Sequence, residues 1–129
     1  MKKTILLVDD DRSERDLFKE AIPEISDDIY YLSAGDGKEA LDLLENSLTS
    51  LPDVIFMDIN MPGMNGWEFL EEYNQLDKEL QNHAIIMMLT TSDNPVDEAR
   101  AKKWSFVANY ITKPLTKELM REIIKNYFN

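Results

Sequence analysis

Short apolar runs and longer amphipathic segments alternate along this chain. Five runs that are rich in apolar and β-branched residues are predicted strands, at residues 5–8, 29–32, 54–57, 85–89 and 110–111. The first run is an uninterrupted Ile-Leu-Leu-Val that stops at three aspartates, which is typical of a strand buried on both faces of a parallel sheet. The runs are too far apart for hairpins, so a crossover segment is expected between each pair.

The segments between and after these runs have helical periodicity. Apolar residues at spacings of three and four line one side of four segments, which predicts amphipathic helices that each pack one face on the sheet. These residues are Leu17, Phe18, Ala21 and Ile22; Ala40, Leu41, Leu44 and Leu48; Phe69, Leu70, Tyr73 and Leu76; and Leu119, Met120, Ile123, Ile124, Tyr127 and Phe128.

Local signals mark where these helices begin and end. Asp36 followed three residues later by Glu39 resembles a capping box, and Asn94 precedes a proline in the position typical of a first helical turn. Thr116 is the expected N-cap of the last helix. Pro23 is expected to end the first helix.

Strands and helices alternating five times, (βα)5, predict an α/β fold. The expected architecture is a doubly wound, five-stranded parallel sheet with right-handed crossovers and helices on both faces. The helix predicted at residues 94–104 is the exception in this pattern, because its apolar face is thin and its neighbouring positions are basic. Less apolar burial predicts weaker anchoring of that helix.

Composition narrows the function classes. The 129 residues fit one domain, and 43% apolar with 30% charged residues is typical of a globular chain with a core. A net charge of −11 argues against direct binding of nucleic acid. The chain has no cysteine and one histidine, His83, so disulfides, thiolate nucleophiles and multi-histidine metal sites are excluded. No apolar run reaches the roughly 20 residues of a membrane span, so a cytoplasmic protein is expected.

The candidate chemistry lies just after the predicted strands. In an open α/β sheet, ligands bind at the carboxyl ends of the strands. The residues there are Asp9 and Asp10, then Asp58, Thr90 and Lys113. Three carboxylates at one sheet edge repel one another unless protons or a cation offset their charge, and all-oxygen ligands suit Mg²⁺ or Mn²⁺. With a lysine and a hydroxyl opposite, the set describes a pocket that accepts a phosphoryl group.

Four motifs in this order resemble those of the receiver domains of two-component response regulators, of the single-domain chemotaxis type. The motifs are Ile-Leu-Leu-Val-Asp-Asp at residues 5–10, Asp-Ile-Asn-Met-Pro-Gly-Met-Asn-Gly at 58–66, Leu-Thr-Thr at 89–91 and Tyr-Ile-Thr-Lys-Pro at 110–114. The resemblance covers essentially the whole chain. It implies a flavodoxin-like strand order of 2-1-3-4-5.

The resemblance also implies roles for the residues of the pocket. Asp58 would accept a phosphoryl group from a phosphohistidine, supplied by a sensor histidine kinase or a phosphotransfer protein. Asp10 and Asp58 would bind Mg²⁺ directly, Asp9 through water and Asn60 through its backbone carbonyl, and Mn²⁺ would substitute. Lys113 would pair with the phosphoryl oxygens. Such a domain is not an enzyme but a phosphoacceptor that promotes its own phosphorylation and dephosphorylation.

A switch follows from the same resemblance. Thr90 would move toward the phosphoryl oxygens, and Tyr110 would follow from an outward to an inward rotamer, remodelling the face from the fourth strand to the last helix. A cis peptide is expected between Lys113 and Pro114. One departure from the family pattern is Phe106, where many members have Gly or Asn. A positive φ is costly for Phe, so the preceding helix is expected to end by another turn.

Charge divides the chain unevenly. Seven basic and 23 acidic residues precede Arg100, whereas seven basic and two acidic residues lie from Arg100 to Asn129. This basic segment includes the helix, strand and last helix of the expected switch. It suggests an acidic downstream protein partner or an acidic neighbouring subunit, against the plainer alternative of a solvated basic surface.

Three other functions are alternatives to that of a phosphoacceptor. The main alternative is a receiver-like interaction module that acts without phosphorylation. Phosphatases of the haloacid dehalogenase type also use an aspartate after a strand, but they place a second aspartate two residues later, where this chain has Asn60. A flavodoxin-like cofactor binder is disfavoured because three aspartates after the first strand would repel a phosphate. The expected organisation is a single receiver domain, 1–129, with no output domain.

Overall fold

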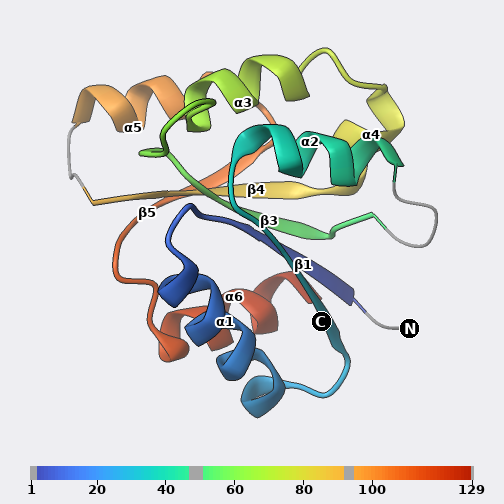
Figure 1. Cartoon of the computed structure of the whole chain (residues 1–129), viewed down its shortest axis with the longest axis vertical. Helices are drawn as coiled ribbons and strands as arrows, with labels where there is room; N and C mark the ends of the chain where they lie inside the picture. The colour runs from blue at the N-terminus through green and yellow to red at the C-terminus, as the bar shows by residue number, and fades with distance from the viewer. Residues whose placement is uncertain (1–2, 47–50, 92–94, 129) are drawn as a thin grey trace.

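The computed structural model describes residues 3–46, 51–91 and 95–128, and it contains a five-stranded sheet with helices on both faces (Figure 1). The strand order is β2-β1-β3-β4-β5, and every neighbouring pair is parallel. The strands are β1 (Lys3–Val8), β2 (Ile29–Ala34), β3 (Val54–Asp58), β4 (Ile85–Thr90) and β5 (Val107–Thr112). The predicted α/β class and the strand order are confirmed.

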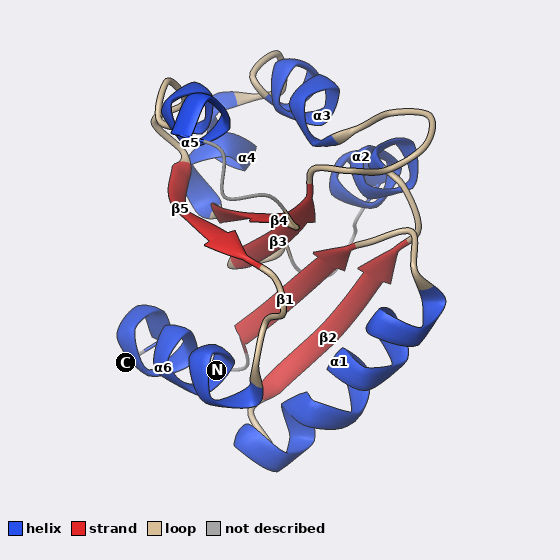
Figure 2. Ribbon diagram, turned by 90° about the vertical axis from the view of Figure 1, so that its left-hand side faces the viewer, coloured by secondary structure: helices blue, strands red, loops and turns tan. Residues whose placement is uncertain are grey.

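Helices cover the two faces of the sheet unequally. Helices α1 and α6 lie on one face, and α2, α3, α4 and α5 lie on the other, as the two views in Figures 1 and 2 agree. None of the described helices has both the length and the apolar composition needed to cross a membrane. The helices are α1 (Arg12–Ile25), α2 (Gly37–Asn46), α3 (Gly66–Tyr73), α4 (Lys78–His83), α5 (Pro95–Ala101) and α6 (Lys117–Phe128).

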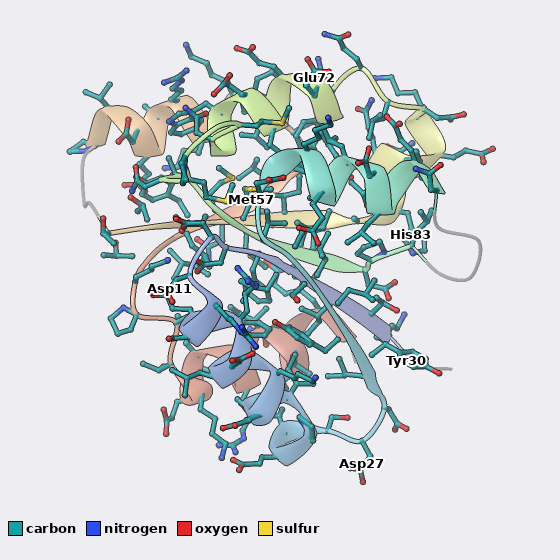
Figure 3. The ribbon with its side chains drawn as sticks, viewed as in Figure 1. Asp11, Asp27, Tyr30, Met57, Glu72 and His83 are labelled. Carbon is teal, nitrogen blue, oxygen red and sulfur yellow. The ribbon has the colours of Figure 1, made fainter. Side chains whose placement is uncertain are left out.

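The central strands are buried on both faces because their side chains alternate between two cores. In β1, Leu6 and Val8 belong to the core under α2 and α3, whereas Ile5 and Leu7 belong to the core under α1 and α6. The same alternation in β3 puts Met57 on the α2 side (Figure 3). This is why both strands appear in the sequence as continuous apolar runs.

The sequence pattern missed one short helix. The apolar stripe from Phe69 to Leu76 predicts one continuous helix, but α3 ends at Tyr73 and α4 begins after Asp77. The Asp77 carboxylate caps α4 by accepting the Glu79 amide at 3.0 Å. The buried Gln81 amide then donates to the carbonyl of Leu76 at 2.7 Å, which satisfies the backbone of the turn between the two helices.

The prediction that Pro23 ends the first helix is wrong, because Pro23 lies inside α1. Proline lacks the N–H that would bond to the carbonyl four residues earlier, and its ring crowds that carbonyl, but Pro23 is only two residues from the end of α1, so both effects are confined to the last turns. The helix continues for two residues, and the Ser26 amide donates to the Ile22 carbonyl at 3.0 Å.

Two of the expected helix caps are present in the structure. The Thr116 hydroxyl accepts the Leu119 amide at 3.1 Å, and the Asp36 carboxylate accepts the Glu39 amide at 2.8 Å. The Glu39 carboxylate accepts from Gly35 rather than from Asp36, so this cap is not a complete capping box. The predictions for Asn94 and Leu48 lie outside the described residues.

The chain between α5 and β5, which includes Phe106, turns without a residue in the left-handed conformation, as expected. Successive amides bond back three residues, from Trp104 to Ala101 at 3.2 Å and from Val107 to Trp104 at 3.1 Å. No residue other than glycine has a positive φ in the described parts of the chain. The Phe106 ring packs edge-on against Tyr73, with centroids 4.8 Å apart, which fixes the turn to the core of the α2 side.

Tyr73 makes fold stability sensitive to alkaline pH. Burial raises the pKa of its hydroxyl from 10.0 to about 12, so its contribution to stability is complete below pH 10 and is lost as the pH rises toward 12. The loss is about 2 to 3 kcal/mol for a shift of this size. We expect Tyr73→Phe to lose less stability than the wild type between pH 9 and pH 12, measured by urea unfolding.

Tyr30→Phe is the matched control, because Tyr30 is 56% exposed on the edge strand β2. It should have the same pH dependence as the wild type. Parallel pH profiles for the wild type and Tyr73→Phe would contradict the assignment to Tyr73.

Candidate functional site

Four strands deliver polar residues to one edge of the sheet. Asp9 follows β1, Asp58 ends β3, Thr90 ends β4, and Lys113 follows β5. Because all five strands are parallel, their carboxyl ends meet at the same edge, which is on the left in Figure 1. Figure 3 labels Asp11 beside this edge, at the start of α1.

Asp9, Asp10 and Asp58 form a cluster in which one carboxylate oxygen of each lies within 4.8 Å of the others. The side chains of Asp9 and Asp58 are buried, whereas Asp10 is exposed. Three hard oxygen donors this close, with an open side, fit Mg²⁺ or Mn²⁺, which keep waters among their ligands. The predicted acidic residues are therefore brought together in a set that could hold a divalent cation.

Backbone hydrogen bonds fix Asp9 at the end of β1. Its amide extends the pairing with β2 by donating to the Ala34 carbonyl at 3.0 Å. Its carboxylate accepts the Asp11 amide at 2.9 Å, and its own carbonyl accepts from the Arg15 guanidinium at 2.6 Å. Asp11 in turn caps α1 through the Ser13 amide, so the loop and the helix are held together.

Asp58 is fixed by the backbone that follows it. The Asn60 amide donates to one oxygen of the Asp58 carboxylate at 3.1 Å. The next helix passes very close to this loop, because the Gly66 amide donates to the Ile59 carbonyl at 3.0 Å. A Cβ on Gly66 would lie 2.8 Å from the Ile59 Cα, so only glycine fits there without a shift. Gly66 lies in the quoted family motif, but only the structure gives this steric reason.

Lys113 reaches the acidic cluster from the end of β5. Its ammonium nitrogen lies 3.0 Å from an Asp9 carboxylate oxygen and 3.1 Å from one of Asp58. Its backbone amide donates to the Thr90 carbonyl at 2.7 Å, which ties the lysine to the end of β4. The peptide bond between Lys113 and Pro114 is cis, as predicted.

Glu14 is a residue of this site that sequence reasoning missed. Its carboxylate lies 2.7 Å from the Lys113 ammonium, the shortest of the three carboxylate contacts of that group. Glu14 is in the first turn of α1, three residues after the N-cap Asp11. In a sequence this spacing predicts at most a capping interaction, so nothing there indicates a contact with a lysine 99 residues away.

Burial and pairing shift the pKa values of these groups in different directions. Burial raises the pKa of Asp9, but hydrogen bonds with Glu14, the Asp11 amide and Lys113 outweigh it, so the net pKa is lowered. Burial raises the pKa of Asp58 overall, against the Asn60 amide and Lys113. Hydrogen bonding with Asp9 raises the pKa of Glu14, and the surrounding carboxylates raise the pKa of Lys113 despite its burial.

The remaining predicted residues have different surroundings. Thr90 is buried at the end of β4, beside the backbone of Lys113. Tyr110 is half-buried in β5, opposite Met88, and packs against the core on the α2 side. Asn60 is exposed, with its amide directed to Asp58.

Both a family model and a curated protein match nearly the whole of this chain. The family described as "Response regulator receiver domain" matches residues 5–125. Among curated proteins, the chain is 31% identical over 121 residues to the sensor histidine kinase CheAY of Helicobacter pylori. The match covers 94% of this chain but only 14% of that protein.

Solved structures of response regulators are similar over the full length. A two-component response regulator from Cytophaga hutchinsonii has a TM-score of 0.86 at 31% identity, covering 100% of this chain and 99% of that chain. The phosphorylated cyanobacterial phytochrome response regulator RcpA has a TM-score of 0.80 at 29% identity, with coverages of 98% and 91%. The Mn²⁺-bound form of response regulator Rcp1 has a TM-score of 0.78 at 29% identity, with coverages of 98% and 94%.

The acidic cluster generates a prediction about cation binding. A divalent cation that binds only the folded chain stabilises it, by about 2.7 kcal/mol when its concentration is 100 times the dissociation constant. We expect Mg²⁺ or Mn²⁺ to raise the free energy of unfolding of the wild type, measured by urea unfolding with and without the ion. Asp10→Asn should lose most of this stabilisation.

Asp10 is suited to this test because it is exposed, so its substitution disturbs little packing. Asp42→Asn, an exposed position on α2, should keep the full effect of the ion. Equal stabilisation of Asp10→Asn and the wild type would mean that the ion binds elsewhere.

Proposed function

This chain belongs to the response regulator receiver family, a family of signalling domains, and we propose that it accepts a phosphoryl group on Asp58 in a Mg²⁺-dependent reaction. The donor is a phosphohistidine on a sensor histidine kinase or a phosphotransfer protein. The phosphorylated chain then signals by binding another protein. The organisation as a single receiver domain and a cytoplasmic location stay predictions.

The observation that supports this proposal most directly is the setting of the Asp58 carboxylate. One of its oxygens accepts the Asn60 amide, and the other faces the Lys113 ammonium at 3.1 Å. The side chain of Asp58 is 5% exposed, so it is held in one orientation at the open edge of the sheet. A fixed carboxylate beside a cation meets the main requirement of phosphoryl transfer, which is positioning and charge neutralisation.

The proposed reaction assigns each residue of the site a role. An oxygen of Asp58 attacks the phosphorus atom, the bond from phosphorus to the histidine nitrogen breaks, and an acyl phosphate forms. Lys113 pairs with the phosphoryl oxygens. Asp9, Asp10 and Asp58, with the backbone carbonyl of Asn60, would hold Mg²⁺. When bound, the cation neutralises charge on the carboxylates and on the incoming group.

Two of the similar response regulators support the proposed chemistry. One similar response regulator is known in a phosphorylated form, and another is known with Mn²⁺ bound. Receiver domains bind a divalent metal at an acidic pocket, and the cluster of three aspartates described above corresponds to that pocket. The similar sensor histidine kinase supports the proposed class of donor.

The proposed switch uses the face formed by β4, α5, β5 and α6. Thr90 moves toward the phosphoryl group, and Tyr110 changes its rotamer in response. Weak anchoring of α5 supports this, because Ala101 is the only buried residue of that helix, all of which is described. Arg100 adds a contact with α3, its guanidinium carbon lying 4.5 Å from the centroid of the Trp67 ring. A lightly held helix is suited to two arrangements of similar free energy.

The side-chain contacts reduce the number of basic residues that could bind an acidic downstream partner. Four of the seven basic residues from Arg100 onward already have contacts within the chain, as Arg100 lies over Trp67 and Lys113 faces the acidic cluster. Lys102 pairs with Glu98, and Lys117 pairs with Glu24. Lys103 is exposed in the turn that follows α5, and it is the side chain that we expect an acidic partner to contact first.

Phosphorylation can be tested with acetyl phosphate as donor and intact mass as the measurement. We expect a gain of one phosphoryl group that requires Mg²⁺ and is abolished by EDTA. The product should be stable in acid and labile in base, as an acyl phosphate is. Asp58→Asn should remain unmodified, and Lys113→Met should bind Mg²⁺ but be modified far more slowly.

A phosphorylated histidine kinase serves as the second donor, because a small donor need not be used by every receiver. No mass gain with either donor, for a folded protein that binds Mg²⁺, would contradict the proposal. The chain would then be a receiver-like interaction module that acts without phosphorylation.

A further inference from the structure

The Lys113 ammonium has three carboxylate partners rather than two. The first two, Asp9 and Asp58, belong to the acidic cluster at the end of the sheet and are almost fully buried. The third, Glu14, comes from α1, and its side chain is 43% exposed. Its contact of 2.7 Å is nevertheless the shortest of the three.

These three contacts use every hydrogen that an ammonium group can donate. A phosphoryl oxygen that binds Lys113 must therefore displace one of the present acceptors. Asp9 and Asp58 are held by backbone amides and belong to the group that fits a cation. Glu14 lies outside that group and next to solvent, so its release exposes its carboxylate to water at little cost.

We propose that Glu14 is a specificity-determining, positioning residue that competes with incoming anions for Lys113. This inference rests on the proposed function of Asp58 and Lys113. In the resting chain, Glu14 holds the ammonium and adds a negative charge at the mouth of the site. Any anion that enters must displace Glu14 and overcome this charge.

Displacing Glu14 costs every donor the same free energy, but donors differ in the binding energy that offsets this cost, so the competition discriminates between them. A small donor such as acetyl phosphate has few contacts beyond its phosphoryl group, so it has little binding energy to offset the cost. A protein donor makes further contacts on the surface around the site, and these contribute to displacing Glu14. Glu14 thus disfavours free phosphate-bearing anions relative to a docked phosphohistidine.

A purely structural role for Glu14 has different consequences. If Glu14 only ties α1 to the loop after β5, its loss would loosen the site and weaken the binding of cations and anions alike. If it acts by charge and competition, its loss makes the site less negative. Cation binding then weakens while anion binding strengthens.

The test measures these two affinities separately by isothermal titration calorimetry at pH 8. The cation is Mg²⁺ alone, and the anion is trifluoroberyllate, BeF₃⁻, added at saturating Mg²⁺ as a mimic of the phosphoryl group. Glu14→Gln removes the charge and keeps the length of the side chain. We expect BeF₃⁻ to bind about five- to tenfold tighter and Mg²⁺ to bind about two- to fivefold more weakly than in the wild type.

Two further variants serve as controls. Glu20→Gln removes an exposed charge from the same helix and should leave both affinities unchanged. Glu14→Asp retains the carboxylate, so it should stay closer to the wild type than Glu14→Gln does. Both changes in Glu14→Gln should shrink as the salt concentration rises, because screening weakens charge effects at a half-exposed position.

The possible results separate this inference from the proposed function. Opposite shifts of the two affinities in Glu14→Gln support the inference. Unchanged affinities, or weaker binding of both ions, overturn it even if acetyl phosphate still modifies Asp58. If no donor modifies Asp58 in the wild type and BeF₃⁻ does not bind, the proposed function fails, and the inference fails with it.

Discussion

Repulsion among carboxylates at one edge of the sheet is the constraint on which the rest of this structure depends. Parallel strands bring Asp9 and Asp58 together, and the loop after β1 adds Asp10. In a partly buried setting such charges cannot lie this close without compensation. Lys113 supplies it from the far end of the chain, and the backbone amides of Asp11 and Asn60 donate hydrogen bonds to the carboxylates of Asp9 and Asp58.

Much of this arrangement could be predicted from the sequence, because buried strands require runs of apolar residues that are visible in it. Strands covered on both faces need apolar residues pointing to both faces, and β1 and β3 have them as unbroken apolar runs at residues 5–8 and 54–57. A parallel sheet puts all of its strand ends at one edge, so Asp9, Asp58 and Lys113 could be grouped although they are far apart in the chain. The order of the strands, in contrast, came from the family resemblance and not from these patterns.

The features that were missed depend on geometry that a periodic pattern does not contain. The break between α3 and α4 follows from hydrogen bonds of a buried amide, Gln81, with the turn, and Pro23 is tolerated because it is near a helix end. Glu14 is similar, since a glutamate in a first helical turn usually reflects capping. Its contact with Lys113 arises only because α1 packs beside the loop after β5.

The position of Lys113 also has a consequence for how the chain folds. Its contacts with Asp9 and Asp58 join residues 104 and 55 positions apart. The aspartates enter the sheet with β1 and β3 at its centre, whereas the lysine follows the edge strand β5, which is the last strand to be synthesised. Until β5 joins the sheet, Lys113 is not in place to balance the acidic edge of the central strands. Contacts that span so much of a chain form slowly in general, so we expect the site to be completed only with the docking of the last strand.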